Sequence, residues 1–391
     1  MLAVTALGSV SGGVFWTGAF FLTREHYRFS PTRNLLFALA MGTAYALVAW
    51  SAGGLTARFE RHGPRRVVAA ALVLWAIAAA VPFSLPGREA GIWAAGVLGG
   101  AASGAVWPIV ESYLGAGRGG AGLRRALGRF NVTWTLSTAV PLLIFPWLTA
   151  AHPLGPLAAC ALANLGAVAL LTRLPRRPGV ASHEVAESHV GAEYPELLRA
   201  ARWLLPQSYV FVATLSPVLP HRLASIGAPI ADSVMAATWM LARFATLVVM
   251  ARVPFWHGRW GALTAAGATL FAGVALSLLS SSLGGLVLGL VLLGAGMGVT
   301  YYASIYYSLA VGHSAVDAGG NFEALIGVGY MLGPLLGLLG RAFPGIGLPG
   351  LALEGSTTVL LAWLVGLGSA FAAGREYLAA RRKRRAPVSF P

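Results

Sequence analysis

The chain has 391 residues, of which 57% are hydrophobic and only 10% are charged. Soluble domains carry about 25% charged residues, so the composition excludes an ordinary soluble protein and predicts an integral membrane protein. The formal net charge is +15, but the positive side chains are distributed over alternate loops, which argues against a nucleic-acid-binding surface. The single cysteine, Cys160, excludes disulfides within the chain and any multi-cysteine metal site.

Apolar stretches long enough to cross a bilayer, about 20 residues each, predict twelve helices. The first six lie at about 4–23, 35–56, 67–86, 91–113, 130–150 and 156–174. The second six lie at about 206–224, 232–251, 261–281, 285–310, 322–343 and 355–373. A membrane barrel would show shorter, alternating segments, so we expect an all-α integral membrane protein.

The loops between these helices differ in their Lys and Arg content. Most of these residues fall in segments 58–66, 115–129, 173–203, 252–260 and 375–385. The opposite loops hold only Arg24, Arg28, Arg33, Arg88, Arg222 and Arg341. By the positive-inside rule the first set is cytoplasmic. We therefore expect a multi-pass protein of the cytoplasmic (inner) membrane with both termini in the cytoplasm.

The two halves of the chain repeat each other weakly, at an offset of about 194 residues that is typical of transporters built from two similar bundles. The matching segments are 57–63 with 251–258, and 97–101 with 291–295. The sequence thus predicts two six-helix bundles related by a pseudo-twofold axis. The predicted domains are a first bundle at 1–174, a cytoplasmic linker at 175–205, a second bundle at 206–373, and a basic cytoplasmic tail at 374–391. Within the linker, segment 194–203 predicts a short interfacial helix.

The loop after the second helix carries a recognisable motif. It reads Glu60-Arg61-His62-Gly63-Pro64-Arg65-Arg66 and follows the pair Gly53-Gly54. It resembles the signature of the major facilitator superfamily, in which a glycine, an acidic residue, a basic residue, a glycine and a basic pair follow helix 2. The spacing after Gly54 is longer here than in the family pattern. The resemblance implies the twelve-helix fold and a gating latch made by Glu60, Arg61, Gly63, Arg65 and Arg66.

Two other signatures test for a drug-exporting antiporter. The arginine that such exporters carry before the glycine cluster of helix 4 is missing at 91–95. The glycine-proline motif of helix 5 is missing too, although Gly333-Pro334 occurs in the symmetry-related helix 11. An efflux antiporter therefore stays an alternative, and the direction of transport stays open.

The resemblance also implies that helices 1, 4, 7 and 10 line a central cavity, with helices 2, 5, 8 and 11 at its sides. Aromatic residues on these helices suit organic solutes, because they offer stacking together with hydrogen bonds. With the intramembrane Arg243, the candidate substrate-binding residues are Trp16, Trp107, Trp134, Trp239, Arg243, Tyr301, Tyr302 and Tyr306. Packing and interfacial positions are the alternative for about half of the aromatic residues.

Charged residues inside spans cost about 2.5 to 3.5 kcal/mol each on insertion scales, so a transporter keeps few without a use. Arg243 lies near the middle of helix 8 and needs a carboxylate, carbonyl groups or a substrate as partner. A structural ion pair is the alternative. Glu111 in helix 4 and Glu323 in helix 11 are candidates for proton coupling, or for solvated positions near helix ends.

These features favour a secondary active transporter that moves a small organic solute by alternating access, with proton coupling as an option. A sensor or scaffold on the same fold is the alternative that does not transport. The spans carry no catalytic constellation, metal-ligand spacing or nucleotide-binding loop, so we expect no enzyme, cofactor, metal or ATP dependence. The expected partners are the solute, possible coupling protons and lipid, with no nucleic acid, and the chain is expected to be a monomer.

Overall fold

The computed structural model describes residues 1–58, 63–115, 118, 120–175, 193–227, 231–311, 316–346 and 355–385. Within these ranges the regular structure is entirely helical. The first half comprises α1 (Leu2–Gly13), the π-helical turn η1 (Val14–Gly18), α2 (Ala19–His26), α3 (Pro31–Arg58), α4 (Pro64–Ser84), α5 (Glu89–Gly115), α6 (Gly120–Leu143), α7 (Phe145–Ala151) and α8 (Gly155–Leu171). The second half comprises α10 (Tyr194–Leu215), α11 (Leu219–Ile226), α12 (Asp232–Arg252), η3 (Pro254–Trp256), α13 (Trp260–Leu279), α14 (Leu283–Val311), α15 (Val316–Ala342), η4 (Pro344–Ile346) and α16 (Ser356–Arg385).

These helices supply the twelve predicted spans. Among the described residues, nine helices are long and apolar enough to cross a bilayer, the first of them being α1, η1 and α2 together. A tenth span consists of α6 and α7, which are bent by 48° relative to each other. The remaining two are α8, a shorter apolar helix of 17 residues, and α10, which begins with charged residues. The prediction of a twelve-helix, all-α protein is confirmed.

The structure differs from the sequence prediction in how two segments are built. Segment 194–203 is not a separate interfacial helix, because α10 continues from Tyr194 through Pro206 to Leu215 and buries Leu197 and Ala201. A proline lacks the backbone donor but does not end a helix whose neighbours pack around it. The basic tail also begins as helix, since α16 runs on to Arg385. The linker residues 176–192 lie outside the described part of the chain.

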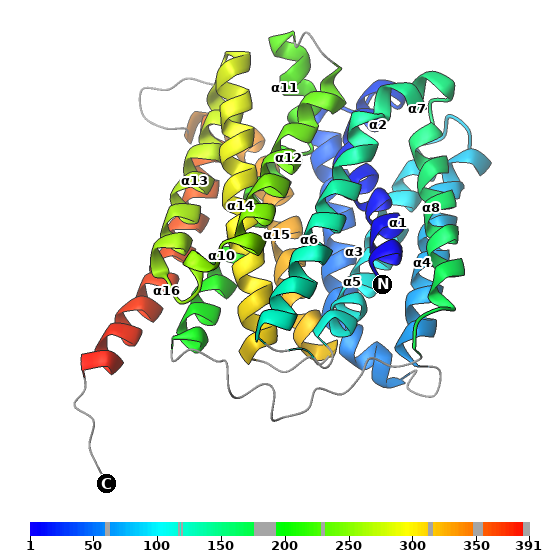
Figure 1. Ribbon diagram of the computed structural model, residues 1–391. Coiled ribbons are helices and arrows are strands. Elements are labelled where there is room, and N and C mark those ends of the chain that lie inside the picture. Colours follow the sequence, from blue (N-terminus) through cyan, green and yellow to red (C-terminus); the bar gives the residue numbers. More distant parts are fainter. Residues whose placement is uncertain are drawn as a thin grey trace.

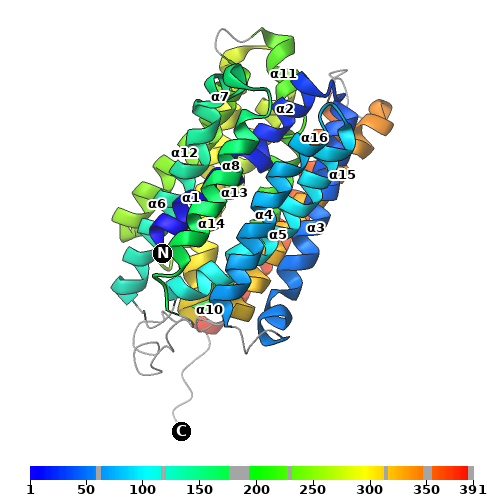
Figure 2. The same ribbon diagram turned by 90° about the vertical axis from the view of Figure 1, so that its right-hand side faces the viewer.

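The two halves stand side by side, with α1 to α8 on the right of Figure 1 and α10 to α16 on the left. Seen from the side in Figure 2, the helices run along one common direction. We call the end where α8 stops and α10 starts the linker side. The opposite end, where α2, α7 and α11 lie, is called the far side (Figure 2).

The halves meet mainly where α3 packs against α15 and α6 packs against α12. Glycines permit the close approach of α3 and α15. A Cβ atom on Gly42 would collide with the backbone of Tyr330, and one on Gly327 would lie 2.6 Å from the Cα atom of Ala46. Small residues at such positions let membrane helices pack backbone to backbone.

Candidate functional site

A cavity lies between the two halves, and both contribute to its wall. Its aromatic lining consists of Trp16, Tyr45, Trp107, Trp134, Tyr209, Trp239, Tyr301 and Tyr330. Its polar lining consists of Ser103, Thr135, Thr138, Ser216, Arg243 and Glu323. The space within it that water molecules can occupy is about 50 Å³, several times the roughly 10–15 Å³ that one water needs. The cavity therefore has room for a small solute.

Six of the eight predicted substrate-binding residues line this cavity, and Tyr302 and Tyr306 do not. Successive residues of a helix point about 100° apart, so Tyr302 and Tyr306 share a face of α14 that Tyr301 does not. Their rings pack against Trp256, with centroids 5.4 Å and 5.3 Å away. We therefore correct their assignment from substrate binding to packing beside the loop between α12 and α13.

Three tyrosines of the cavity were missed by the sequence analysis. The ring of Tyr330 stacks on Trp16 at a centroid distance of 3.9 Å, and the ring of Tyr45 stands edge-on to both. Tyr330 lies in the segment 329–337 that holds the glycine-proline pattern, which was its only signal. Tyr209 lies in an apolar run of α10 without any distinguishing pattern.

Trp16 belongs to η1, the π-helical turn between α1 and α2. A π-turn inserts one residue into a helix and is common at functional sites. Here the turn directly follows Gly13, where α1 packs closely against α6. The approach is so close that a Cβ on Gly13 would collide with the carbonyl oxygen of Thr138. The turn therefore sits in the wall of the cavity, and it positions the indole of Trp16 toward α15.

Arg243 is the buried cation of the cavity, with 2% of its surface exposed. Its Nη2 atom donates to the hydroxyl of Tyr209 at 3.0 Å. Its guanidinium carbon lies 4.5 Å from the ring centroid of Trp134 and 4.6 Å from that of Tyr301. These two rings stack on each other across the halves, 5.3 Å apart and inclined by only 4°. Aromatic faces thus stabilise the charge of Arg243.

Two carboxyl groups meet beside the cavity. Glu111 of α5 and Glu323 of α15 are both buried, and they lie close enough to interact electrostatically across the halves. The hydroxyl of Tyr45 of α3 donates a hydrogen bond to Glu323, also across the halves. Two neighbouring buried carboxylates would repel each other, so the pair favours a proton on one of them. The structure therefore brings the two predicted coupling residues into one cluster.

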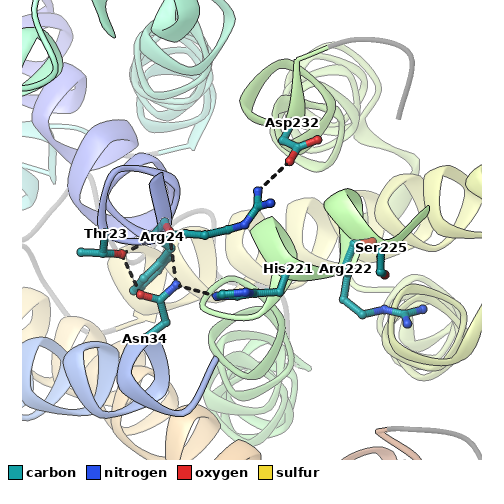
Figure 3. Close-up of polar contacts among 8 residues, drawn as sticks. Thr23, Arg24, Asn34, His221, Arg222, Ser225 and Asp232 are labelled. Atoms are coloured by element: carbon teal, nitrogen blue, oxygen red, sulfur yellow. Dashed lines mark hydrogen bonds and ion pairs between the residues drawn. The ribbon is translucent and has the colours of Figure 1, made fainter. Parts of the chain in front are cut away.

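On the far side, polar contacts join the halves (Figure 3). Arg24 of α2 forms an ion pair with Asp232 of α12, with 3.0 Å between Nη1 and Oδ2. Asn34 of α3 donates to the carbonyl oxygen of Pro217 at 3.1 Å and lies 3.5 Å from Nε2 of His221. Thr23 fixes the Asn34 side chain by donating to its Oδ1 atom at 2.7 Å. These contacts link the two halves on the far side of the cavity.

No family model and no curated protein matches the sequence. An autoinhibited peptide transporter of the POT family matches the structure with a TM-score of 0.68 at 14% identity, over 100% of this chain and 98% of that one. The proton:xylose symporter XylE of the major facilitator superfamily matches with a TM-score of 0.67 at 10% identity, over 95% and 93% of the two chains. The human organic anion transporter MFSD10 matches with a TM-score of 0.65 at 16% identity, over 95% and 97%. The chain has the major facilitator fold.

This fold gives the signature loop a structural context on the linker side. Gly63 precedes α4 with a φ of 73°, a left-handed conformation that favours glycine. Arg65 donates to the carbonyl oxygen of Leu174 at 2.8 Å, so it joins α4 to the end of α8 within the first half. The implied latch between the halves is therefore not made by Arg65, and Arg66 is exposed. Glu60 and Arg61 lie outside the described residues.

A cross-half contact does occur on the linker side, at a place that the signature does not mark. The hydroxyl of Tyr302 in α14 donates to the backbone oxygen of Arg124 in α6 at 3.2 Å. Nearby, a Cβ on Gly128 of α6 would approach that of Ala251 in α12 to 2.9 Å. Direct contacts between the halves thus lie on both sides of the central cavity.

Proposed function

We propose that this protein is a secondary active transporter, which moves a small organic solute across the cytoplasmic membrane by alternating access. The cavity between the two halves carries this proposal, because it lies between far-side and linker-side contacts that can open in turn. The solved structures of this fold named above are transporters, a class without a catalytic centre, and this agrees with the prediction of a non-enzymatic protein.

We further propose that the linker side is cytoplasmic. Positive side chains of the described loops gather there, among them Arg124, Arg125 and Arg129 on α6 and Arg252 and Arg259 around η3. In this orientation the structure is closed by Arg24 and Asp232 toward the outside. Of the signature residues, Glu60, Arg61 and Arg66 are then the candidates for the cytoplasmic gate, whereas Gly63 and Arg65 act on the geometry of α4 within the first half.

Proton coupling is the finer part of the proposal, and Glu111 with Glu323 carries it. Their cluster spans the halves, so separation of the halves would move the two carboxyl groups apart and break the hydrogen bond from Tyr45 to Glu323. That separation changes which proton-binding state is favoured, since an isolated buried carboxylate is costly. The opening of one gate would therefore be linked to the uptake or release of a proton.

Uptake by the purified protein in liposomes tests the function. The panel contains labelled sugars, nucleosides, short peptides and organic anions, each with and without an inward proton gradient. Saturable uptake of at least one class, above that of protein-free liposomes, is expected. Binding of a solute without its transport would instead favour a sensor. Accumulation that is driven only by an outward proton gradient would favour an efflux antiporter, which exchanges the solute for protons.

A further inference from the structure

Two nitrogen atoms in the wall of the cavity have no hydrogen-bond partner. They are Nε of Arg243 and Nε1 of Trp239, both fully enclosed. The two residues lie four positions apart on α12, so their side chains share one helix face, and both line the cavity. Each atom can donate a hydrogen bond and neither can accept one. A ligand that satisfies both must therefore present acceptor atoms only.

The positive charge of Arg243 also lacks a bound counter-ion within the described chain. Its protein contacts are the hydroxyl of Tyr209 and the faces of Trp134 and Tyr301. Arg243 acts electrostatically on Glu323 across the cavity, but the carboxyl group of Glu323 accepts a hydrogen bond from Tyr45 and forms no ion pair with Arg243. A buried charge without an ion pair is costly, and an anionic ligand would relieve that cost.

The remaining lining determines what the rest of such a ligand can be. The indoles of Trp16 and Trp107 and the ring of Tyr330 offer flat apolar faces. Thr135 and Thr138 offer hydroxyl groups on the opposite half, although both hydroxyls already donate within α6. A small body with an apolar face fits this wall, whereas a cationic group would be repelled by Arg243.

We infer that the solute is a small organic monoanion, such as a monocarboxylate, whose anionic group is bound by Arg243 Nε and Trp239 Nε1. This inference rests on the proposed transport function and narrows its substrate class. One anionic group is matched to one cation, so a dianion would bring an uncompensated charge into the buried site. Transport would then be electroneutral, because the protein would carry one monoanion together with one proton bound at the Glu111–Glu323 cluster.

The test measures ligand binding by thermal stabilisation and by quenching of tryptophan fluorescence in the purified full-length protein. The probes are acetate, lactate, benzoate and indole-3-acetate, each compared with its amide, and benzylamine as the matched cation. At least one carboxylate should bind about tenfold or more tightly than its amide, because bonds to charged groups are stronger than neutral ones. Benzylamine should not bind.

Variants connect binding to the two donors. Arg243→Gln should abolish the preference for the carboxylate, and Arg243→Lys should retain part of it because the charge remains. Trp239→Phe keeps an aromatic ring but removes the donor, so carboxylate binding should weaken several-fold. Arg125→Gln on the exposed face of α6 is the matched control, and its binding should equal that of the unchanged protein. A variant that misfolds is recognised by its elution profile in size-exclusion chromatography. In that case the binding measured for Arg243→Lys or Trp239→Phe tests the inference.

The outcomes separate this inference from the transport function. No carboxylate binding better than its amide, or an unchanged preference in Arg243→Gln, would overturn the inference. Saturable transport of a neutral solute together with that result would leave the transport function intact. Carboxylate binding that depends on Arg243, without transport of any probe, would instead support the site and contradict the transporter.

Discussion

At the scale of single residues, burial determines how a few polar side chains interact with their neighbours. Arg243 would be an ordinary surface cation on a soluble helix, but in the cavity its charge is stabilised by two aromatic faces and one hydroxyl. Glu323 likewise accepts a hydrogen bond from Tyr45 and lies near the buried carboxyl group of Glu111, so a proton on one of the two carboxyl groups avoids their repulsion. The expected effects of substitutions here follow from charge rather than from size.

Glu323→Gln tests proton coupling. The introduced amide can still accept a hydrogen bond from Tyr45, but it cannot release a proton. Accumulation of the solute driven by a proton gradient should fall to the level of protein-free liposomes, whereas exchange of labelled for unlabelled solute should persist. Glu89→Gln, at a position outside the cavity that pairs with Arg33, is the control and should accumulate normally. Full gradient-driven accumulation by Glu323→Gln would remove this residue from the coupling step.

His257, in the loop after η3, gives the protein a pH-dependent stability. Burial, with a further contribution from Arg124, lowers the pKa of His257 to about 4. The unfolded chain takes up this proton below about pH 6.5, so the stability contributed by the neutral ring is present above that pH and lost as the pH falls toward 4. The ring stacks on Tyr306, 4.6 Å between centroids.

The thermal midpoint of the purified protein should therefore decrease between pH 7 and pH 4.5. His257→Phe keeps an aromatic ring against Tyr306 and removes the titratable group, so its midpoint should decrease less over the same range. Equal slopes for the two proteins would show that other groups cause the pH dependence.

At the scale of elements, backbone-to-backbone packing sets the positions of the cavity helices. A Cβ on Gly294 of α14 would collide with the carbonyl oxygen of Trp239 and lie 3.0 Å from the Cβ of Ala242. Because Trp239 and Arg243 stand on this part of α12, a shift of α12 away from α14 would move both donors of the cavity.

Gly294→Ala should destabilise the protein by about 1–3 kcal/mol, as overpacked cores do, and should also weaken solute binding. Gly267→Ala on α13 is the matched control, since nothing lies within 4 Å of its Cβ position. That change should instead stabilise the helix by about 0.5–1 kcal/mol. Thermal midpoints of the two variants, measured side by side, check both signs. A midpoint for Gly294→Ala as high as that of the control would contradict the close packing of α12 and α14.

At the scale of the whole molecule, the proposed alternating access implies that the contacts on the far side stabilise one of two conformations. The ion pair between Arg24 and Asp232 is partly exposed, with 28% and 20% of the side chains accessible. Such a pair is worth at most about 1 kcal/mol, which corresponds to about a fivefold change in an equilibrium constant. Its removal should favour opening toward the far side.

Arg24→Gln should therefore increase the rate at which an impermeant maleimide added on the far side labels Ser216→Cys, a cavity position, by a few-fold. The only native cysteine, Cys160, is buried and should contribute little background. Arg33→Gln is the control, because the Arg33–Glu89 pair lies on the same side but within the first half. Adding Asp232→Asn to Arg24→Gln should bring no further increase, since both break one interaction. Equal labelling in Arg24→Gln and Arg33→Gln would show that the ion pair does not hold the halves together.

The sequence by itself determined the architecture, because a bilayer accepts only long apolar helices and their number can be counted. It also indicated Arg243, Glu111 and Glu323, since a charge inside a span is costly wherever it lies. It did not show that Tyr301 lines the cavity whereas Tyr302 and Tyr306 do not, because the sequence of α14 does not reveal which of its apolar faces meets the cavity. Nor did it find Tyr45, Tyr209 and Tyr330, which resemble packing residues in composition.

Only the tertiary structure decided which side chains from distant helices meet. Glu111 and Glu323 lie 212 positions apart in the sequence, yet both are buried and lie close enough to interact. Trp134 and Tyr301 form one stacked pair over Arg243, although they belong to different halves. Hydropathy shows which segments can cross the bilayer, a property that each helix has by itself. The repeat shows that the two halves are similar, but neither signal says which side chains meet. The cavity depends on how the helices pack and rotate against one another, and this is fixed by shape and by polar contacts between the halves.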